Sequence, residues 1–419
     1  MELGTTLKGF QQCLESIPEH DTRAKIGPRA FIIAFLFGFR GDRGKRSLES
    51  IRRSVMNATG ETLSRGSFWE RIAAGRLFHF LLLLAEEAMK KVAGVEFAPG
   101  EIKALLVLLG VSGILLVDSS SMSLPDMAGA VLPGPRRTSS PAVIKWHSCF
   151  DLIKGKIDWF DLSPGTSHDQ NHFPPLPSLA SVLVIFDLGY LDYCLMQAID
   201  NVGGFFLCRI KTNAVVKIGE VREGLPKKWK GRMLFDKRLP QGKSIIDVRG
   251  LFKEGLFEFR VVGFWNPIEE IYHWYATNLL APARLMYPLY RLRWQTELLF
   301  KAAKSSLRLS DQGSANPNIV ISLVLASIIV TTLSQSLGVM MARMFQFERD
   351  QTRMPSIQRA GIILAQVSDE IGKHLLHGTR ASLKALREKL QLLAAELFDP
   401  NRKRETSIQR VLRVAKEAA

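Results

Sequence analysis

Two aspartates, Asp118 and Asp187, each end a short aliphatic run in the sequence. The runs are GILLVD (113–118) and SVLVIFD (181–187). Continuous apolar runs of this length are typical of strands buried on both faces of a sheet that is covered by helices. Ligands of open α/β sheets are usually met where strands end, so two carboxylates on neighbouring strands could share a divalent cation such as Mg²⁺. A polar loop after a strand is the simpler explanation of either aspartate taken alone.

A second feature with possible chemistry is the stretch YRLRWQTELLFKAAK (290–304). It carries four side chains of different chemistry at helical spacing: Tyr290, Arg293, Glu297 and Lys304. At about 100° per residue, an α-helix places these four within an arc of about 60° while the intervening leucines pack inward. A solvated helix face with an Arg293–Glu297 ion pair would explain the charges alone. It would not explain the tyrosine or the two upstream aspartates.

The spacing Tyr-x2-Arg-x3-Glu-x6-Lys of these residues resembles the signature of a known family. The family is the DDE transposases of bacterial insertion sequences in family four, which are related to the Tn-five transposase. LLVDSSSMSLP around Asp118 resembles the family's first-aspartate segment. VIFDLGYLDY around Asp187 resembles its second, an Asp-x-Gly-aromatic turn into a helix.

The likeness extends in the right order over about residues 110 to 345. FFLCRIK (205–211) matches the strand expected next, with its arginine Arg209. YHWYATNLL (272–280) resembles the strand that leaves a β insertion. The resemblance therefore implies an α/β fold with an RNase H-like catalytic core and a β-strand insertion, flanked by helical N- and C-terminal regions.

This resemblance also implies an order of structural units along the chain. A helical region that binds DNA ends comes first, followed by the first part of the core, the β-rich insertion and the second part of the core. The last region carries no family motif, and its amphipathic helices could pair subunits or could equally complete the core of the monomer. The expected boundaries are 1–105, 106–212, 213–282, 283–345 and 346–419, respectively.

The implied activity is cut-and-paste DNA transposition at the terminal inverted repeats of the chain's own element. Asp118, Asp187 and Glu297 would be catalytic and would hold two Mg²⁺ or Mn²⁺ ions for strand cleavage and strand transfer. The side chains expected to bind DNA are Tyr290, Arg293, Lys304 and Arg209. The expected partners are double-stranded transposon ends and target DNA, with a homodimer in the synaptic complex. The alternative is a transposition inhibitor or domesticated relative that binds ends without cutting.

Family relatives often excise their element through a hairpin intermediate in which one base is flipped onto an aromatic side chain. A flipped base needs a stacking platform. Trp265 and Trp294 are the two candidates, although core packing is the commoner role of tryptophan.

The charge balance favours a polyanionic partner. Lys and Arg total 56 against 40 Asp and Glu, a formal charge of +16, which suits nucleic acid or an anionic membrane surface. In the N-terminal region, helical spacing with a break at 57–60 predicts two short helices beside a basic cluster, an arrangement compatible with DNA binding. A solvated helical face explains it equally well. The cluster comprises Arg40, Arg43, Lys45, Arg46, Arg52 and Arg53.

One segment, 318–341, approaches the length of a membrane-spanning helix. Polar residues interrupt it and it stands alone as a strong candidate, so we predict a buried core helix and no membrane partner; a membrane protein built around it is the competing reading. The N-terminus lacks the pattern of a signal peptide, and the four cysteines lie far apart. These features predict a reduced, cytoplasmic setting, and the family resemblance implies a place at the nucleoid of a bacterium.

Two other polar groups are expected to be unrelated to catalysis. Glu370, His374 and His377 can be drawn on one helical face, but without the HExxH order they favour a polar helix surface over a metal site. His168 and Asp169 precede the second aspartate strand and are predicted to form a surface turn.

Overall fold

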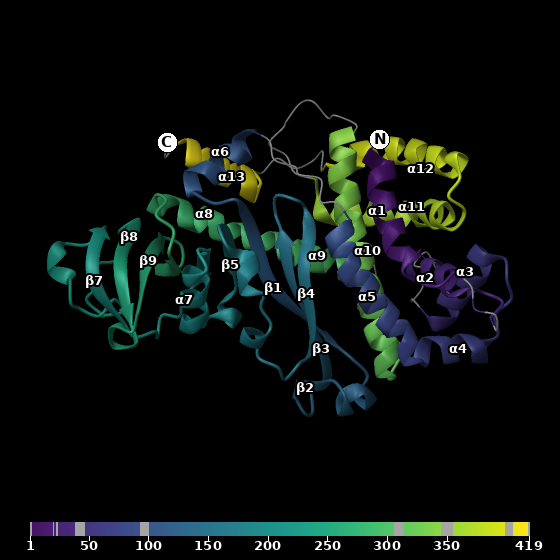
Figure 1. Cartoon of the computed structure of the whole chain (residues 1–419). Helices are drawn as coiled ribbons and strands as arrows, with labels where there is room; N and C mark the ends of the chain where they lie inside the picture. The colour runs from purple at the N-terminus through teal and green to yellow at the C-terminus, as the bar shows by residue number, and fades with distance from the viewer. Residues whose placement is uncertain are drawn as a thin grey trace.

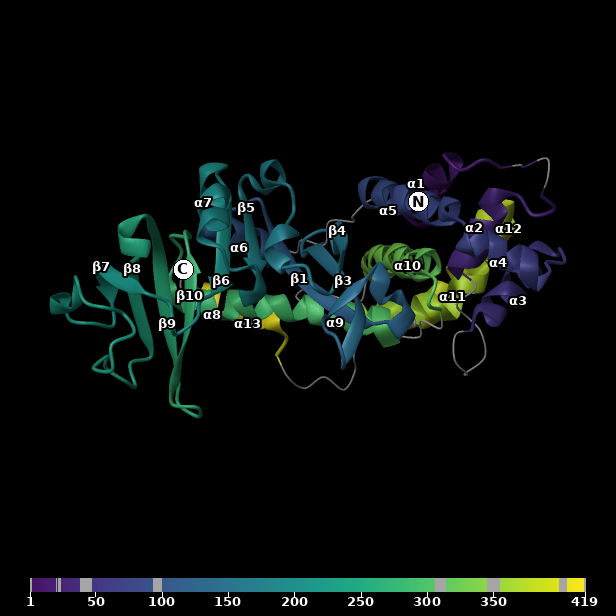
Figure 2. The same ribbon diagram turned by 90° about the horizontal axis from the view of Figure 1, so that it is seen from below.

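A ten-stranded sheet and a bundle of helices lie at opposite ends of an elongated molecule (Figures 1 and 2). The structure is a computed structural model. It describes residues 2–19, 21, 24–37, 47–92, 100–305, 314–344, 355–398 and 405–417.

Five strands form the central part of the sheet, in the order β4-β3-β1-β5-β6. β3 pairs antiparallel with both β4 and β1, whereas β1, β5 and β6 run parallel to one another. Their positions agree with the strands predicted from the sequence. The strands are β1 (Gly113–Ser123), β3 (Ser140–Asp151), β4 (Lys156–Pro164), β5 (Val182–Phe186) and β6 (Phe205–Arg209), and a short β2 (Pro133–Arg136) pairs with the start of β3.

Both faces of this sheet are covered, as the unbroken aliphatic runs predict. Side chains alternate between the faces of a strand. Ile114 and Leu116 of β1 therefore enter one hydrophobic core and Leu115 and Val117 enter another. The first core includes helices α6 (Gly100–Leu109), α8 (Met286–Tyr290), α9 (Trp294–Ser305) and α13 (Ser407–Lys416), and the second includes α7 (Tyr193–Asn201).

The β insertion extends the same sheet. Its last strand pairs antiparallel with β6, and the others follow in the order β9, β8, β7. A buried ion pair anchors it: Arg260 Nη2 lies 2.7 Å from Asp247 Oδ2, and Arg260 Nη1 donates to the carbonyls of Leu279 and Ala281 just before α8. The insertion strands are β7 (Val216–Glu223), β8 (Ile245–Phe252), β9 (Phe257–Asn266) and β10 (Ile271–Thr277).

The helical end of the molecule combines N-terminal and C-terminal segments in one core. At its centre lies α10 (Pro317–Met344). This helix is long and apolar enough to cross a membrane, but 94% of its most apolar 18-residue segment is buried inside the protein. That burial agrees with the predicted core helix. The surrounding helices are α1 (Glu2–Glu15), α2 (Pro28–Phe37), α3 (Leu48–Thr59), α4 (Arg65–Ala73), α5 (Gly75–Lys91), α11 (Ile357–His377) and α12 (Arg380–Leu393).

The C-terminal segments divide between the two ends of the molecule. α11 packs against α2, α10 and α12, whereas α13 returns to the sheet and contacts α6 and α8. Lys416 of α13 is paired with Glu101 of α6. Much of the region after residue 345 therefore completes the fold of its own chain.

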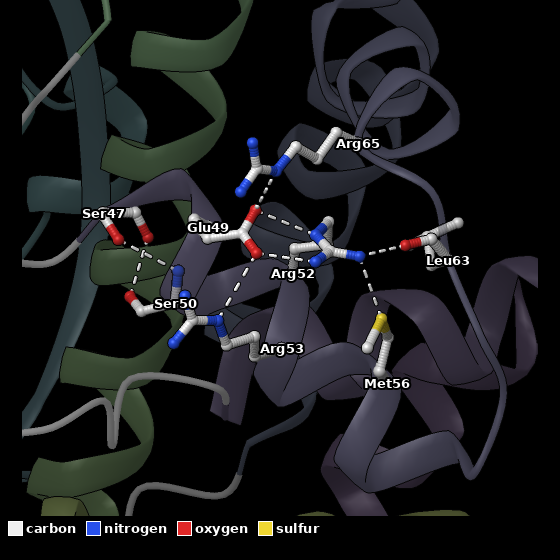
Figure 3. Close-up of polar contacts among 8 residues, drawn as sticks. All are labelled: Ser47, Glu49, Ser50, Arg52, Arg53, Met56, Leu63 and Arg65. Atoms are coloured by element: carbon white, nitrogen blue, oxygen red, sulfur yellow. Dashed lines mark hydrogen bonds and ion pairs between the residues drawn. The ribbon is translucent and has the colours of Figure 1, made fainter.

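The two short N-terminal helices are separated as predicted, but the break begins only at Gly60, because α3 continues to Thr59. Gly60 ends α3 in the left-handed conformation with φ of 72°, which glycine adopts without steric cost, and the Ser64 side chain caps α4. The basic side chains here surround Glu49 (Figure 3). Arg53 Nε and Arg65 Nε each lie 3.4 Å from a Glu49 oxygen.

Arg52 has a structural role in this pair of helices. It donates two hydrogen bonds to Glu49, of 3.0 and 2.6 Å, and a third to the Leu63 carbonyl just before α4 (Figure 3). Its side chain is only 16% exposed. Arg52 is thus not available to DNA as a member of the predicted basic cluster, whereas Arg53 is 66% exposed. Arg40, Arg43, Lys45 and Arg46 lie outside the described residues.

Candidate active site

Asp118 and Asp187 lie side by side because of the register of two parallel strands. The pairing of β1 with β5 ends at Val117 and Phe186, and the two aspartates are the next residues. The prediction that Asp118 ends its strand is wrong, because β1 continues to Ser123 in antiparallel pairing with β3. Alternation along β1 turns Asp118 toward the face covered by α9.

The segment with the Tyr-Arg-Glu-Lys signature is not one continuous α-helix. A 3-10 turn at Arg291–Arg293 joins α8 to α9. In a 3-10 turn, side chains three residues apart eclipse one another. Tyr290 and Arg293 accordingly lie together, with the Arg293 guanidinium carbon 6.0 Å from the centre of the Tyr290 ring. Glu297 follows in the first turn of α9.

One guanidinium joins all three acids. Arg293 Nη1 lies 2.5 Å from Asp118 Oδ2, and Nη2 lies 2.5 Å from Glu297 Oε1. Arg293 Nε is 3.7 Å from Asp187 Oδ1. The structure therefore brings together the three acids that the sequence singles out, with a positive charge between them.

Asp118 is the most buried of the three acids, at 8% exposure. Burial raises the pKa of its carboxyl group, and the charge of Arg293 and a 2.9 Å hydrogen bond from the Thr296 hydroxyl oppose that rise. The Ser119 amide donates to the other carboxylate oxygen at 2.9 Å. Burial lowers the pKa of Arg293, but the carboxylates around it, Asp118 first, raise it by more. The guanidinium therefore stays charged.

Tyr290 faces the acids and is buried. Its hydroxyl donates to Asp187 Oδ1 at 3.2 Å, and its ring packs against Tyr275 with ring centres 4.9 Å apart and the ring planes tilted by 51°. Burial, with the negative charge of Asp187, raises the pKa of the phenol. Tyr290 is therefore a neutral donor that orients Asp187.

A cavity of about 720 Å³ holds the three acids together with Arg293 and Lys304. Lys304 Nζ donates to the Ser121 carbonyl of β1 at 3.1 Å, and burial lowers its pKa. Arg209 lies in a neighbouring cavity of about 240 Å³ that also contains Arg293, Glu297 and Trp294. The four residues predicted to bind DNA thus line two adjoining cavities, which share Arg293 and Glu297.

The two tryptophan candidates differ in position. Trp294 is 51% exposed and lines the smaller cavity next to the acids. Trp265 is half-buried in the β insertion, packed edge-on to Tyr272 with ring centres 4.9 Å apart. Trp294 is the aromatic side chain of the pair that adjoins the acids.

The three carboxylates supply oxygen ligands of the kind that Mg²⁺ and Mn²⁺ prefer. Within the described residues, no three acids, histidines or cysteines are grouped closely enough to hold one ion as they stand. Arg293 supplies the positive charge shared by these acids. The three carboxylates can bind a divalent cation once the Arg293 guanidinium no longer occupies their oxygens.

Some residues at the site were missed or misplaced by the sequence analysis. Thr296 is fully buried and bonds Asp118; its spacing of three from Arg293 was the available signal. His168 and Asp169 lie at a turn with His168 exposed, as predicted, but Asp169 is half-buried and accepts hydrogen bonds from Ser119 and Lys145.

The polar residues of α11 have other partners. Glu370 Oε1 accepts a hydrogen bond from Lys389 at 2.6 Å, and His374 Nδ1 lies 2.9 Å from Ser382 Oγ. They belong to contacts between α11 and α12, and neither lines the cavity of the three acids.

Comparisons with known proteins assign the chain to a family. Residues 110–333 match the transposase DDE domain. The transposase for insertion sequence element IS1151 of Clostridium perfringens is 22% identical over 243 residues, which are 47% of this chain and 51% of that protein. The chain therefore matches about half the length of this curated relative.

Among solved structures, the cryo-EM structure of the piggyBac transposase synaptic complex with hairpin DNA superposes with a TM-score of 0.48 and 9% identity. It covers 97% of this chain and 88% of that chain, a likeness too weak to support conclusions about function. The domain match spans more than half of the sequence and includes all three acids. The chain therefore belongs to the transposase DDE domain family of enzymes.

Proposed function

We propose that this protein is an active cut-and-paste transposase that cleaves and joins DNA strands at the terminal inverted repeats of its own insertion sequence. The observation that carries the proposal is the contact of one guanidinium, Arg293, with Asp118, Asp187 and Glu297. These acids are far apart in the sequence and line one cavity. The ungapped Tyr-Arg-Glu-Lys spacing supports membership of the corresponding branch of insertion-sequence family four.

The catalytic core is of the RNase H-like type in this proposal. The strand order β4-β3-β1-β5-β6, with three antiparallel strands followed by two parallel ones, supports it. The acids come from the middle of β1, the end of β5 and the first turn of α9. The β insertion lies between the second and third acids, as the resemblance implies.

Asp118, Asp187 and Glu297 would hold two Mg²⁺ or Mn²⁺ ions. When bound, such ions activate a water or 3′-hydroxyl nucleophile and stabilise the leaving oxygen. Thr296 and the Ser119 amide hold the Asp118 carboxylate in one orientation, and Tyr290 does the same for Asp187. Phosphoryl transfer depends mainly on such positioning and on charge neutralisation.

The basic side chains would hold the DNA phosphates beside the acids. Arginine binds phosphate through two parallel hydrogen bonds, and lysine acts as a point charge, so Arg293 and Lys304 would contact the strand at the larger cavity. Arg209 would hold DNA at the smaller one. Trp294, exposed at that cavity, would be the platform for a flipped base in a hairpin intermediate.

The partners in this proposal are double-stranded transposon ends and target DNA. The α3–α4 pair would bind the ends, and two copies of the chain would meet in the synaptic complex. The protein would work in the bacterial cytoplasm at the nucleoid. The formal charge of +16 supports a nucleic-acid partner.

A transposition inhibitor that binds ends without cutting is the competing function. The meeting of the three acids favours the enzyme, because a protein that only binds DNA has no chemical use for them. Incubation of the purified protein with end-containing DNA and Mg²⁺ tests the choice. Nicking at the ends supports the enzyme, and binding without nicking supports the inhibitor.

Substitutions identify the residues responsible. Asp118→Ala, Asp187→Ala and Glu297→Ala should each abolish cleavage and leave end binding largely intact. Asp126→Ala is the matched control, because Asp126 is an exposed acid close to the end of β1. Normal cleavage by Glu297→Ala would show that the site is assigned wrongly.

A further inference from the structure

The turn that follows Asp187 is held against the sheet by the buried side chain of Tyr190. Asp187 is followed by a 3-10 turn, Leu188–Tyr190, and the Tyr190 side chain is fully buried. The Tyr190 hydroxyl lies 2.9 Å from Nδ1 of His147, a fully buried residue of β3. His147 in turn pairs with Ser119 in the sheet, one residue after Asp118. One contact therefore joins the turn of Asp187 to the strand beside Asp118.

Asp169 makes a second connection between the turn after Asp187 and the strand that carries Asp118. The Asp169 carboxylate accepts hydrogen bonds from Ser119 Oγ at 3.3 Å and from Lys145 Nζ at 3.0 Å. It also packs against Gly189 of the turn, where an added Cβ would lie only 2.7 Å from Asp169 Oδ2. The glycine of the Asp-x-Gly-aromatic turn thus makes room for a carboxylate that is bonded next to Asp118.

The Tyr190 hydroxyl belongs to a connected group of polar side chains around His147. His147 Nε2 lies 2.8 Å from Ser163 Oγ, and the His147 ring stacks on His172 with centres 4.4 Å apart. Burial, followed by the charge of His172, lowers the pKa of His147 to about 4, and burial raises the pKa of Tyr190. Both groups are therefore neutral near pH 7. Buried neutral groups keep such hydrogen bonds because leaving one unmade costs its desolvation energy.

We propose that Tyr190 and Asp169 are positioning residues that set the separation of Asp187 from Asp118, and thereby the affinity of the site for divalent metal. Neither side chain touches the reacting atoms. Tyr190 holds the turn through His147, and Asp169 holds it through Ser119 and Gly189. The inference rests on the proposed function, since it concerns the metal affinity of the same acids. Residues that orient metal ligands typically contribute 10–100-fold to metal affinity.

Tyr190→Phe tests the first contact. It removes the hydroxyl and keeps the ring, which packs against Phe173 with centres 5.8 Å apart. The matched control is Tyr272→Phe in the β insertion, which removes a partly buried hydroxyl that donates to the Pro240 carbonyl at 2.9 Å and accepts from the Lys243 amide at 3.1 Å. The measurement is a titration of the full chain with Mn²⁺ in the absence of DNA. Electron paramagnetic resonance monitors the free ion. We expect the dissociation constant of Tyr190→Phe to rise about tenfold and that of Tyr272→Phe to stay unchanged.

Gly189→Ala tests the second contact. Gly189 does not have positive φ, so the added methyl group acts only through Asp169. The control is Gly75→Ala at the start of α5, where a Cβ meets nothing within 4 Å. We expect weaker Mn²⁺ binding for Gly189→Ala alone, with end-DNA binding retained. Because this variant leaves Tyr190 intact, it tests the positioning role of Asp169 even if Tyr190→Phe does not fold.

Asp118→Asn separates failure of this inference from failure of the proposed function. If Asp118→Asn binds Mn²⁺ as tightly as the unaltered protein, the metal site itself is wrong. If Asp118→Asn weakens binding but Tyr190→Phe and Gly189→Ala match their controls, the site stands and the positioning roles are overturned. Weakening by all three variants supports both.

Discussion

Arg293 and Asp118, 175 positions apart in the sequence, meet through a contact of 2.5 Å between Nη1 and Oδ2. Their side chains are only 18% and 11% exposed. The contact compensates the charge of a buried carboxylate. Because Arg293 also bonds Glu297, any metal ion that uses these oxygens must compete with the guanidinium for them.

Replacement of Arg293 by glutamine should therefore act in opposite directions on the two ligands. Without DNA, Arg293→Gln should bind Mn²⁺ about tenfold more tightly, because hydrogen bonds to charged groups contribute about 1.5–3 kcal/mol and no longer oppose the ion. The same variant should bind end DNA more weakly, with a salt dependence smaller by about one phosphate contact. Titrations with Mn²⁺ and with labelled end DNA measure the two effects.

Arg291→Gln is the control for this prediction. Arg291 is an exposed arginine in the same 3-10 turn, and it borders only the smaller cavity. It should leave Mn²⁺ binding without DNA unchanged. Equal or weaker Mn²⁺ binding by Arg293→Gln would contradict the competition.

Thr296→Val should impair catalysis without loss of DNA binding. Valine keeps the shape of the fully buried Thr296 but removes its hydrogen bond to Asp118. We expect a loss of about 1 kcal/mol of stability and a drop of about tenfold in cleavage rate at limiting Mg²⁺. The control is Thr332→Val in α10, whose buried hydroxyl bonds only the Ile328 carbonyl of its own helix. A normal cleavage rate for Thr296→Val would contradict the role of Thr296 in orienting Asp118.

The buried His147 predicts a loss of stability in mild acid. Its pKa is about 4 in the folded protein against an ordinary 6.5, so below pH 6.5 the unfolded chain binds a proton that the folded chain does not. The free energy of unfolding should fall by about 2 kcal/mol between pH 7 and pH 5 through this group. Urea unfolding at the two pH values should show a smaller decrease for His147→Gln than for the unaltered protein. His79→Gln, at an exposed position, should show the full decrease.

Neighbouring arginines in α3 should have different roles. Arg52→Gln should lower the thermal midpoint, because Arg52 links Glu49 to the Leu63 carbonyl ahead of α4. Arg53→Gln should leave the midpoint unchanged and weaken end binding, since Arg53 is 66% exposed. Thermal unfolding and DNA titration of both variants check this. A destabilised Arg53→Gln, or a fully stable Arg52→Gln, would contradict the assignment.

The local order of this chain could be read directly from its residues. The aliphatic runs before Asp118 and Asp187 predicted strands buried on both faces, because only such strands have no polar face. The burial of 318–341 followed from its interrupted apolar pattern. The Tyr-Arg-Glu-Lys spacing predicted which side chains belong together. These features depend on neighbours in the sequence, which is why the sequence sufficed.

Contacts between distant segments were decided only by the tertiary structure. The 3-10 turn before Glu297, the place of Arg293 among the acids and the burial of Tyr290 depend on how α8 and α9 pack against the sheet, with α9 on β1 and α8 on β6. Asp169 looked like part of a surface turn because its partners, Ser119 and Lys145, come from other strands. Spacing along the chain determines which residues share a face, but packing determines what that face meets.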